Sequence, residues 1–353
     1  MTIRLTRRRF MSNAAALGAL AGSNLAMPHI ARSQASEITV SCYGGAYEKF
    51  FREELIPTFT EKTGATVNLA LGTAKDFVPL MRAAGTDNPP LDVLMTNEVI
   101  CQILRSEGFF EPIPEDKVPN MKDVAAIARF PDDMAVTGIL QPIGITYRTD
   151  LLPNPPQSWA ELFTREDLKG KTGIYAITNS CGFMFVLLMA RHFGGSEANI
   201  DAAFAEIEKL KPFNQVDFSG TMEGLLAQGE VVVAPLDFAA VMRLQNSGMP
   251  VSAVVPPEGL IAFDQVFNVS KGGTKKELAY AWVDYMLSPE TQSKLVSGFF
   301  SSPTNTKAEV PAELASNPLL LTGDKLNAVV RHDWEAANAN RNDIVDKWNR
   351  TMS

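Results

Sequence analysis

The sequence predicts an α/β protein with two lobes, each built like a Rossmann domain on a mostly parallel sheet. From Glu37 onward, short β-branched runs alternate with longer amphipathic runs, which is typical of βαβ units. The 353 residues are 46% hydrophobic and 20% charged, which is enough material for more than one core. A Pro- and Asp-rich stretch over 112–133 separates two groups of such units, and no repeat of fixed period is visible.

The first 35 residues have the composition of an export signal. They hold five arginines and no acidic residue, and their Ala- and Gly-rich apolar run is too short to span a bilayer core of about 30 Å. Thr6–Phe10 resembles the twin-arginine signal, which implies export in a folded state. Small residues at Ser33 and Ala35 fit cleavage before Ser36. We therefore expect a periplasmic mature protein.

The charge balance and the rare residue types exclude several function classes. Without residues 1–35 the chain keeps 27 basic and 40 acidic side chains, a net charge of −13, which argues against a nucleic-acid partner. Three Cys and three His are scattered singly, so neither a disulfide framework nor a metal site is expected. A bridge between Cys42 and Cys101 stays open. We expect no cofactor.

The first predicted unit is a strand over 37–43, a turn at Gly44 and Gly45, and a helix over 46–64. Aromatic and aliphatic residues recur there at three to four positions and predict the buried stripe of the helix, with a kink at Pro57 and an end at Gly64. These residues are Tyr47, Phe50, Phe51, Leu55 and Phe59.

Two further units complete the first group. Strands over 65–71 and 91–96 are each followed by a helix, over 76–85 and 97–108. The three strands end at Gly44–Gly45, Gly72–Thr73 and Thr96–Asn97. Because ligands of open α/β sheets bind outside the carboxyl ends of the strands, these three loops are expected to face one crevice.

The second group begins with a strand over 143–148. Further strands are predicted over 172–177, 231–235 and 251–256, and helices over 183–195, 201–210, 220–228 and 237–248. The pattern closes with a strand from 265 and helices over 275–287 and from Pro289. We predict one lobe over 36–140 to which 265–310 returns, and a second over 141–264 on which 311–353 packs.

Several motifs occur in an order that resembles one family, the extracellular solute-binding proteins of the spermidine/putrescine type. They are PxFxxxTG (57–64), LDVLMT (91–96), GITYRTD (144–150), PxSWAELF (156–163), LKGKTG (168–173), VVPPEG (254–259) and AWVDYMLSPETQSKL (281–295). The resemblance implies the type II periplasmic-binding fold, with crossover strands near residues 140 and 265. It also implies a non-enzymatic subunit of an ABC importer that closes on a small solute by hinge motion and docks on a membrane permease. We expect a monomer.

In the first lobe the candidate ligand contacts are the residues at the three strand ends. Glycines at the first turn let backbone N–H groups approach a bound group, although a plain turn explains them equally. Two tyrosines flank this turn, where the polyamine binders have an aromatic wall. Thr96 and Asn97 offer hydrogen bonds, with helix capping as the alternative. The full set is Tyr43, Gly44, Gly45, Tyr47, Thr73, Thr96, Asn97 and Glu98.

In the second lobe the candidates precede apolar helices or follow strands. Asn179, Ser180 and Cys181 form a predicted helix N-terminus. Asp237 and Asp264, the latter beside Phe263, are the candidate carboxylates for holding an ammonium between them. Capping explains Asp237 almost as well.

The chain departs from the polyamine-binding pattern in three places. Residues 179–184 contain no acid, and the tryptophans expected after the 231–235 strand and before Asp264 are missing. A polyamine needs a countercharge at each end. A nitrogenous solute with one amine and a carboxylate or hydroxyls, such as an amino acid or an opine-like conjugate, fits better than a polyamine-like one.

Three other functions compete. A transferase on the same fold would use Cys181, at a helix N-terminus, as nucleophile. A ferric-ion receptor would need paired tyrosines, and the six tyrosines include no adjacent pair. A chemosensory or adhesin role is the third, and only genetic context would distinguish it.

Overall fold

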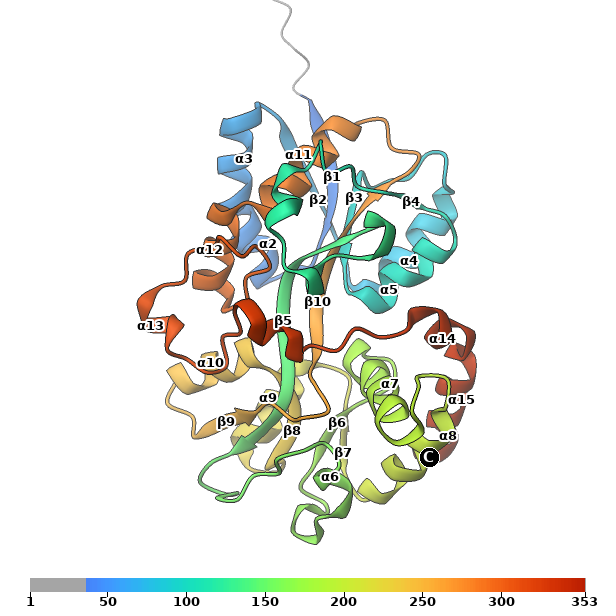
Figure 1. Ribbon diagram of the computed structural model, residues 1–353, viewed down its shortest axis with the longest axis vertical. Helices are drawn as coiled ribbons and strands as arrows, with labels where there is room; N and C mark the ends of the chain where they lie inside the picture. Colours follow the sequence, from blue (N-terminus) through green and yellow to red (C-terminus); the bar gives the residue numbers. More distant parts are fainter. Residues whose placement is uncertain (1–35, 353) are drawn as a thin grey trace, which may run out of the picture. The chain divides into compact units, whose positions relative to one another are not determined.

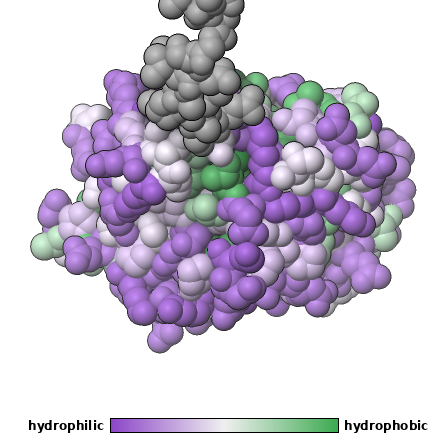
Figure 2. Space-filling view, turned by 90° about the horizontal axis from the view of Figure 1, so that it is seen from above, coloured by the Kyte–Doolittle hydropathy of each residue, from purple (hydrophilic) through white to green (hydrophobic). Residues whose placement is uncertain are grey.

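The computed structural model describes residues 36–352, so the export signal predicted for residues 1–35 lies outside the described residues. From Glu37 onward the chain forms one unit. In this part of the chain no helix is long and apolar enough to cross a membrane. Hydrophilic side chains cover most of the face seen in Figure 2.

One large sheet runs through the unit in the order β2-β1-β3-β10-β5-β8, with β4 paired to β10 and β9 to β5 (Figure 1). The pairs β1–β2 and β1–β3 are parallel, whereas β10 is antiparallel to both β3 and β5. A short parallel pair, β6–β7, is linked to β8 by a single bridge between Thr172 and Val233. The strands are β1 (Glu37–Cys42), β2 (Thr66–Leu71), β3 (Val93–Thr96), β4 (Phe110–Glu111), β5 (Val136–Arg148), β6 (Gly173–Tyr175), β7 (Asn214–Val216), β8 (Val233–Asp237), β9 (Val251–Val254) and β10 (Ile261–Ser270).

The helices that follow these strands confirm the predicted βαβ pattern. The helices of the first group, with those that return to it, are α2 (Ala46–Phe50), α3 (Ile56–Thr63), α4 (Ala74–Ala84), α5 (Glu98–Ser106), α11 (Lys276–Leu287) and α12 (Pro289–Phe299). The others are α6 (Glu161–Thr164), α7 (Ser180–Gly194), α8 (Ile200–Ile207), α9 (Ser219–Gln228), α10 (Phe238–Asn246), α13 (Ala312–Ala315), α14 (Trp334–Ala339) and α15 (Arg341–Met352).

The two long strands β5 and β10 lie where the crossover strands were predicted. They pair antiparallel from Ile261↔Ile143 to Phe267↔Val136. At one end β10 continues into pairing with β3, and at the other β5 continues into pairing with β8 and β9. In Figure 1 both strands run between the upper group, with β1, and the lower group, with β8. In proteins that close by hinge motion, the chain segments that cross between the two lobes form the hinge.

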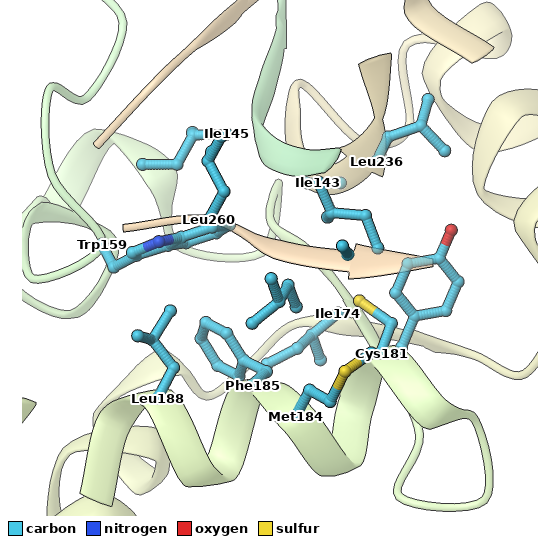
Figure 3. Packing of buried hydrophobic residues seen from close by; sticks show 14 of the residues in the cluster. Ile143, Ile145, Trp159, Ile174, Cys181, Met184, Phe185, Leu188, Leu236 and Leu260 are labelled. Atoms are coloured by element: carbon cyan, nitrogen blue, oxygen red, sulfur yellow. The ribbon is translucent and has the colours of Figure 1, made fainter. Parts of the chain in front are cut away.

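The buried apolar residues separate in the same way. Two clusters draw mainly on the strands β1, β3 and β10 and the helices packed on them, with Phe51, Phe59 and Trp282 in one and Phe77 and Phe110 in the other. A third cluster centres on α7, which is buried from Cys181 to Ala190 (Figure 3). A helix buried all round requires an apolar sequence on every face, which this run supplies.

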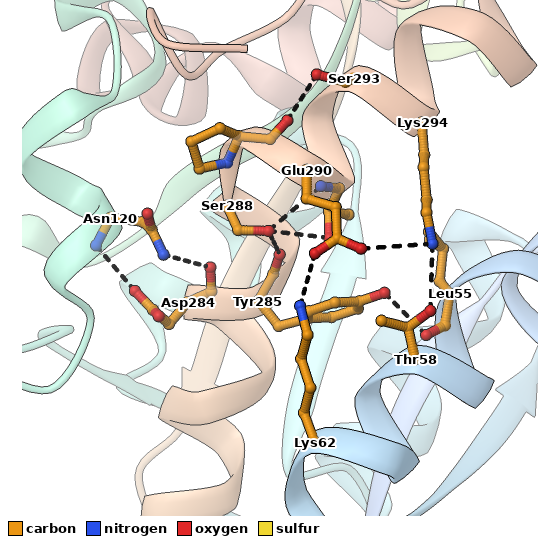
Figure 4. Close-up of polar contacts among 12 residues, drawn as sticks. Leu55, Thr58, Lys62, Asn120, Asp284, Tyr285, Ser288, Glu290, Ser293 and Lys294 are labelled. Atoms are coloured by element: carbon orange, nitrogen blue, oxygen red, sulfur yellow. Dashed lines mark hydrogen bonds and ion pairs between the residues drawn. The ribbon is translucent and has the colours of Figure 1, made fainter. Parts of the chain in front are cut away.

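Contacts between distant segments bring α11 and α12 back onto α3, as Figure 4 shows. The Tyr285 hydroxyl donates to the carbonyl of Leu55 at 2.9 Å. Lys62 pairs with Glu290 at 2.6 Å, on the surface, where such a pair contributes little. The buried tyrosine contact is therefore the stronger restraint on this return, although the lobe boundary at residue 310 stays a prediction.

The helix predicted over 46–64 is interrupted instead of simply kinked. A π-helical turn over Phe51–Leu55 separates α2 from α3, directly before Pro57. Proline removes one N–H donor and its ring crowds the carbonyl four residues earlier, so the preceding turn widens. Gly64 ends α3 in the left-handed conformation, as predicted.

Candidate functional site

The pairing of β5 with its two neighbours decides which side chains share a face of the sheet. Phe263 is paired with Gln141, and Asp237 with Ile143 two residues further along β5. Because paired residues, and residues two apart, project to the same side, Gln141, Asp237 and Phe263 lie on one face. We call this the central face. Asp264 is paired with Leu140, so it projects from the opposite face.

Two tyrosines that follow β1 pack together beside the central face, Tyr43 directly after the strand and Tyr47 in α2. The Tyr47 hydroxyl donates to Oε1 of Gln141 at 3.1 Å, and the Tyr43 hydroxyl is 2.9 Å from that of Thr96. The two rings pack edge to face, with centroids 5.6 Å apart. These contacts join the segments that follow β1 and β3 to a crossover strand.

Residues from β6 and β8, in the lower group of strands, complete this arrangement. The Tyr175 ring, at the end of β6, packs edge to face on Phe263 with centroids 6.3 Å apart, and its hydroxyl donates to that of Ser219 at 3.0 Å. We call Tyr43, Tyr47, Gln141, Tyr175, Asp237 and Phe263 the central cluster. It contains hydroxyl groups, one amide, aromatic faces and one carboxylate, which are groups suited to binding a small polar solute.

Asp237 is the carboxylate of the central cluster, and it is buried. Its Oδ1 accepts the backbone N–H of Ala240 at 2.7 Å, so the capping alternative holds for this oxygen. Burial raises the pKa of Asp237, while the nearby charge of Arg243 lowers it. The charge of Asp237 in turn contributes to the raised pKa of Tyr47 and of Cys181. A cation bound there would offset the desolvation of the carboxylate.

Glu98 and Asp264 belong to a separate charged cluster on the opposite face of the crossover strands. Glu98 forms a buried ion pair with Arg105, and its backbone N–H donates to Oδ1 of Asp264 at 3.2 Å. The guanidinium groups of Arg105 and Arg331 both lie over the Phe130 ring, at 4.7 and 4.5 Å from its centroid. Burial raises the pKa of Asp264 to about 6 and that of Glu98 to about 8, and both arginines oppose the rise.

This geometry corrects the expected carboxylate clamp. Asp237 and Asp264 lie on opposite faces of the paired strands, so they do not converge on one ammonium. The cavity beside Asp264 and Glu98 measures about 40 Å³, close to the space of a single water. Asp264 therefore faces arginine charges, and Asp237 is the carboxylate that the central cluster offers.

Asn179 and Ser180 lie at a second opening, at the start of α7. The Asn179 side chain caps the helix by accepting the N–H of Cys181 at 2.8 Å. Both residues line a cavity of about 440 Å³ together with Val99, Ile100 and Arg341. Helix α5 follows β3, whereas α7 follows β6. The cavity therefore lies between helices that belong to different groups of strands.

Other predicted residues take capping or turn roles. Asn97 caps α5, accepting the N–H of Ile100 at 3.2 Å, and so takes the alternative role. Thr73 is exposed and caps α4 in a reciprocal box with Asp76. Gly44 and Gly45 are exposed, and Gly45 has a positive φ of 69°, which glycine adopts without strain.

The three cysteines are buried and unpaired, so the bridge left open between Cys42 and Cys101 is absent. Burial, followed by the charge of Asp237, raises the pKa of the Cys181 thiol well above its usual range. A catalytic thiol needs the opposite shift. We expect an aromatic disulfide reagent to leave all three thiols of the native protein unmodified over minutes, and to modify all three once denaturant is added. Rapid modification of one native thiol would contradict this burial.

Three residues around these openings were missed by the sequence reasoning. Gln141 lies in β5 before the predicted start of that strand, Tyr175 ends a strand whose side chains were not considered, and Arg341 lies in a segment without predicted elements. No local signal placed Gln141 in the strand, because Gly138 and Pro142 on either side of it are poor strand formers.

Comparison with known proteins supplies the family. Residues 54–322 match the model of the bacterial extracellular solute-binding protein family. The chain is 22% identical to the putrescine-binding periplasmic protein PotF of Escherichia coli, over 85% of this chain and 87% of that one. It is 24% identical to the gamma-aminobutyric acid-binding protein of Pseudomonas aeruginosa, over 76% and 77% of the two chains.

Solved structures agree on the fold. An ABC transporter protein from Clostridium perfringens superposes with a TM-score of 0.77 at 25% identity, over 90% of this chain and all of that one. A putative extracellular solute-binding protein from Bordetella parapertussis gives 0.79 at 21% identity, over 90% and 99%. The predicted type II periplasmic-binding fold is therefore confirmed. The chain belongs to the bacterial extracellular solute-binding proteins, a family of binding proteins of transporters and not of enzymes.

Proposed function

We propose that this solute-binding protein is the substrate-binding subunit of an ABC importer, and that it captures a small nitrogenous solute at the central cluster. The observation that carries this proposal is the buried Asp237 carboxylate on the same face as Phe263 and Gln141, whose amide oxygen accepts the Tyr47 hydroxyl. A carboxylate in a partly dry site surrounded by aromatic rings favours a cation over a neutral or anionic group.

The binding step follows from the position of the crossover strands. Tyr43 directly follows β1 and Tyr47 lies in α2, whereas Asp237 ends β8 and Tyr175 ends β6. A solute that contacts both sets stabilises the closed arrangement over any arrangement in which they separate. In the proposed cycle the closed protein docks on a membrane permease and releases the solute there. Export through the twin-arginine signal, cleavage before Ser36, a monomeric state and the two lobe boundaries are parts of the same proposal.

A thermal-shift screen of amines, amino acids and sugar-amine conjugates tests the solute class. A solute present at 100 times its dissociation constant stabilises the folded protein by about 2.7 kcal/mol. Putrescine and 4-aminobutanoate are the first probes, because relatives of the chain are named for binding them. If no nitrogenous compound in the screen raises the melting temperature, the proposal is wrong.

Replacing Asp237 with Asn is expected to weaken binding of the best amine by about 10- to 100-fold, because a hydrogen bond to a charged partner contributes about 1.5–3 kcal/mol. Asn keeps the oxygen that caps α10, so the fold is retained. Isothermal titration gives the affinities. The matched control is Asp264→Asn, which removes a carboxylate from the opposite face and should change the affinity less than about threefold. Equal losses in the two variants would contradict the assignment.

A further inference from the structure

Residues 328–334, which we call the strap, cross the face of β5 and β10 that lies opposite to the central face. Figure 1 shows this part of the chain passing over both strands on its way to α14. Val330 and Arg331 line the small cavity beside Asp264 and Leu140, which are paired and project from that opposite face. The strap therefore lies behind the two crossover strands when they are viewed from the central cluster.

Both ends of the strap are attached to the lower group. The N–H of Leu260, which is buried in the cluster around α7, donates to the carbonyl of Ala328 at 2.8 Å, and the N–H of Val330 donates to the carbonyl of Leu260 at 2.8 Å. Further along, Nδ1 of His332 lies 3.5 Å from Oε1 of Glu197, in the loop between α7 and α8. The strap is therefore expected to move with the lower group.

Arg331, in the middle of the strap, contacts the upper group. Its Nη2 donates to the carbonyl of Ile127, and its guanidinium lies 4.5 Å from the centroid of the Phe130 ring. Phe130 is buried in the cluster that includes Phe77, and Ala128, between the two contact residues, is buried in the cluster of β1. A half-buried side chain thus connects a segment of the lower group to the upper group.

The contact of Arg331 is one that resists separation. Burial lowers the pKa of Arg331, whereas the charges of Glu98 and Asp264 raise it. The Phe130 ring and the carbonyl of Ile127 together orient the planar guanidinium. Pulling a partly desolvated cation away from its acceptor leaves a charged donor unpaired, which is more costly than breaking a neutral hydrogen bond.

The position of this contact decides which motion it opposes. The crossover strands β5 and β10 carry the chain between the two groups, so the hinge axis runs through them. Rotation about such an axis moves the two faces in opposite senses. When the groups approach each other on the central face, they separate on the face behind it. Closure around a solute would therefore draw Arg331 away from Ile127 and Phe130.

We propose that the strap is a restraint that holds the ligand-free protein open, with Arg331 as its contact to the upper group. This restraint acts before a solute binds, so it goes beyond the proposed function and does not depend on the solute class. Closure must break the contact, which lowers the apparent affinity for any solute that favours the closed state. Weakening the contact should shift the ligand-free protein toward the closed state and tighten binding.

Replacing Arg331 with Met tests the restraint, because Met keeps an unbranched stem over the Phe130 ring and removes the donors. Pulsed electron paramagnetic resonance measures the distance between spin labels at Lys75→Cys and Thr221→Cys, two exposed positions that follow the carboxyl ends of β2 and β7. The native cysteines are buried, so the added thiols take the labels. We expect shorter distances in the ligand-free variant, with the ratio of closed to open protein raised by about tenfold, the usual scale for losing a charged hydrogen bond.

Arg331→Lys, which keeps the charge and loses the planar donor group, should shift the distances in the same direction by less. Isothermal titration should show that Arg331→Met binds the best solute of the screen up to about tenfold more tightly. The matched control is Arg129→Met, because the ion pairs of Arg129 with Glu115 and Asp133 remain within the upper group. It should leave the distances unchanged and the affinity within about threefold of the native value.

Melting temperatures establish that the variants fold, and Arg331→Lys decides on the same criterion if Arg331→Met does not. The restraint is refuted if the ligand-free variant shows the native distance distribution, or if its distances become longer. The distance measurement needs no solute. It therefore separates failure of the restraint from failure of the proposed function, in which no amine binds to the native protein.

Discussion

Replacing Gly182 with alanine is expected to destabilise the fold by about 3 kcal/mol or more, the upper range for overpacking a well-packed interior. A methyl group at this position would lie 2.2 Å from the carbonyl oxygen of Ala176 and 2.6 Å from that of Tyr175. Both obstacles are backbone atoms, which cannot rotate away as a side chain can. Chemical denaturation of native and variant protein gives the difference in unfolding free energy.

The same substitution should also abolish solute binding, because α7 must move away from the end of β6. That movement displaces Asn179 and Ser180 from their cavity and Tyr175 from Phe263. Gly224→Ala is the control, since nothing lies within 4 Å of the added methyl group and the residue is inside α9. It should stabilise the protein by about 0.5–1 kcal/mol through helix propensity. A Gly182→Ala variant as stable as the native protein would show that the start of α7 is not closely packed.

Local pattern was enough to predict most of the helices and strands, because their signals are contained within short segments. The apolar run after Cys181 could only be a buried helix, and α7 is buried over ten consecutive residues. The turn glycines and the apolar run over 91–96 predicted where β1 and β3 end. In the structure Tyr43 and Thr96, at these two ends, lie within hydrogen-bond distance of each other. Motif order supplied the family, which no single motif identifies.

The start of β5 was not predictable in this way. The strand begins at Val136, seven residues before the expected position, and includes Gly138, Gln141 and Pro142. Glycine and proline are poor strand formers, so their presence indicated a loop. Pairing with β10 along this stretch compensates for the weak propensity. Gln141 was missed as a partner of Tyr47 for that reason.

The division of the carboxylates between two faces was also outside the reach of the sequence. Whether Asp237 and Asp264 share a face depends on how β5 pairs with β8 on one side and with β10 on the other. A shift of one residue in either register would move a carboxylate to the other face. The register therefore decides that Asp237 joins the central cluster, while Asp264 joins Glu98 and the two arginines.

That position gives Asp264 a measurable effect on stability. Burial raises its pKa to about 6 from the ordinary 3.8, although Arg331 and Arg105 lower it. A carboxyl group whose pKa is raised by folding binds its proton more tightly in the native state than in the unfolded state. Its contribution to stability is therefore fully present below about pH 4 and is lost as the pH rises to about 6.

Asp264→Asn removes this titration and keeps an oxygen that accepts the backbone N–H of Glu98. The unfolding free energy of the variant, relative to the native protein, should rise by about 2 kcal/mol between pH 4 and pH 6, since one pKa unit corresponds to about 1.4 kcal/mol and part of the titration lies outside this range. The negative charge of Asp264 also raises the pKa of Glu98, so its removal acts in the same direction at higher pH. Denaturant titrations at half-unit steps of pH measure the difference. A constant difference across that range would mean that Asp264 ionises in the fold as it does in water, which the burial beside Glu98 does not permit.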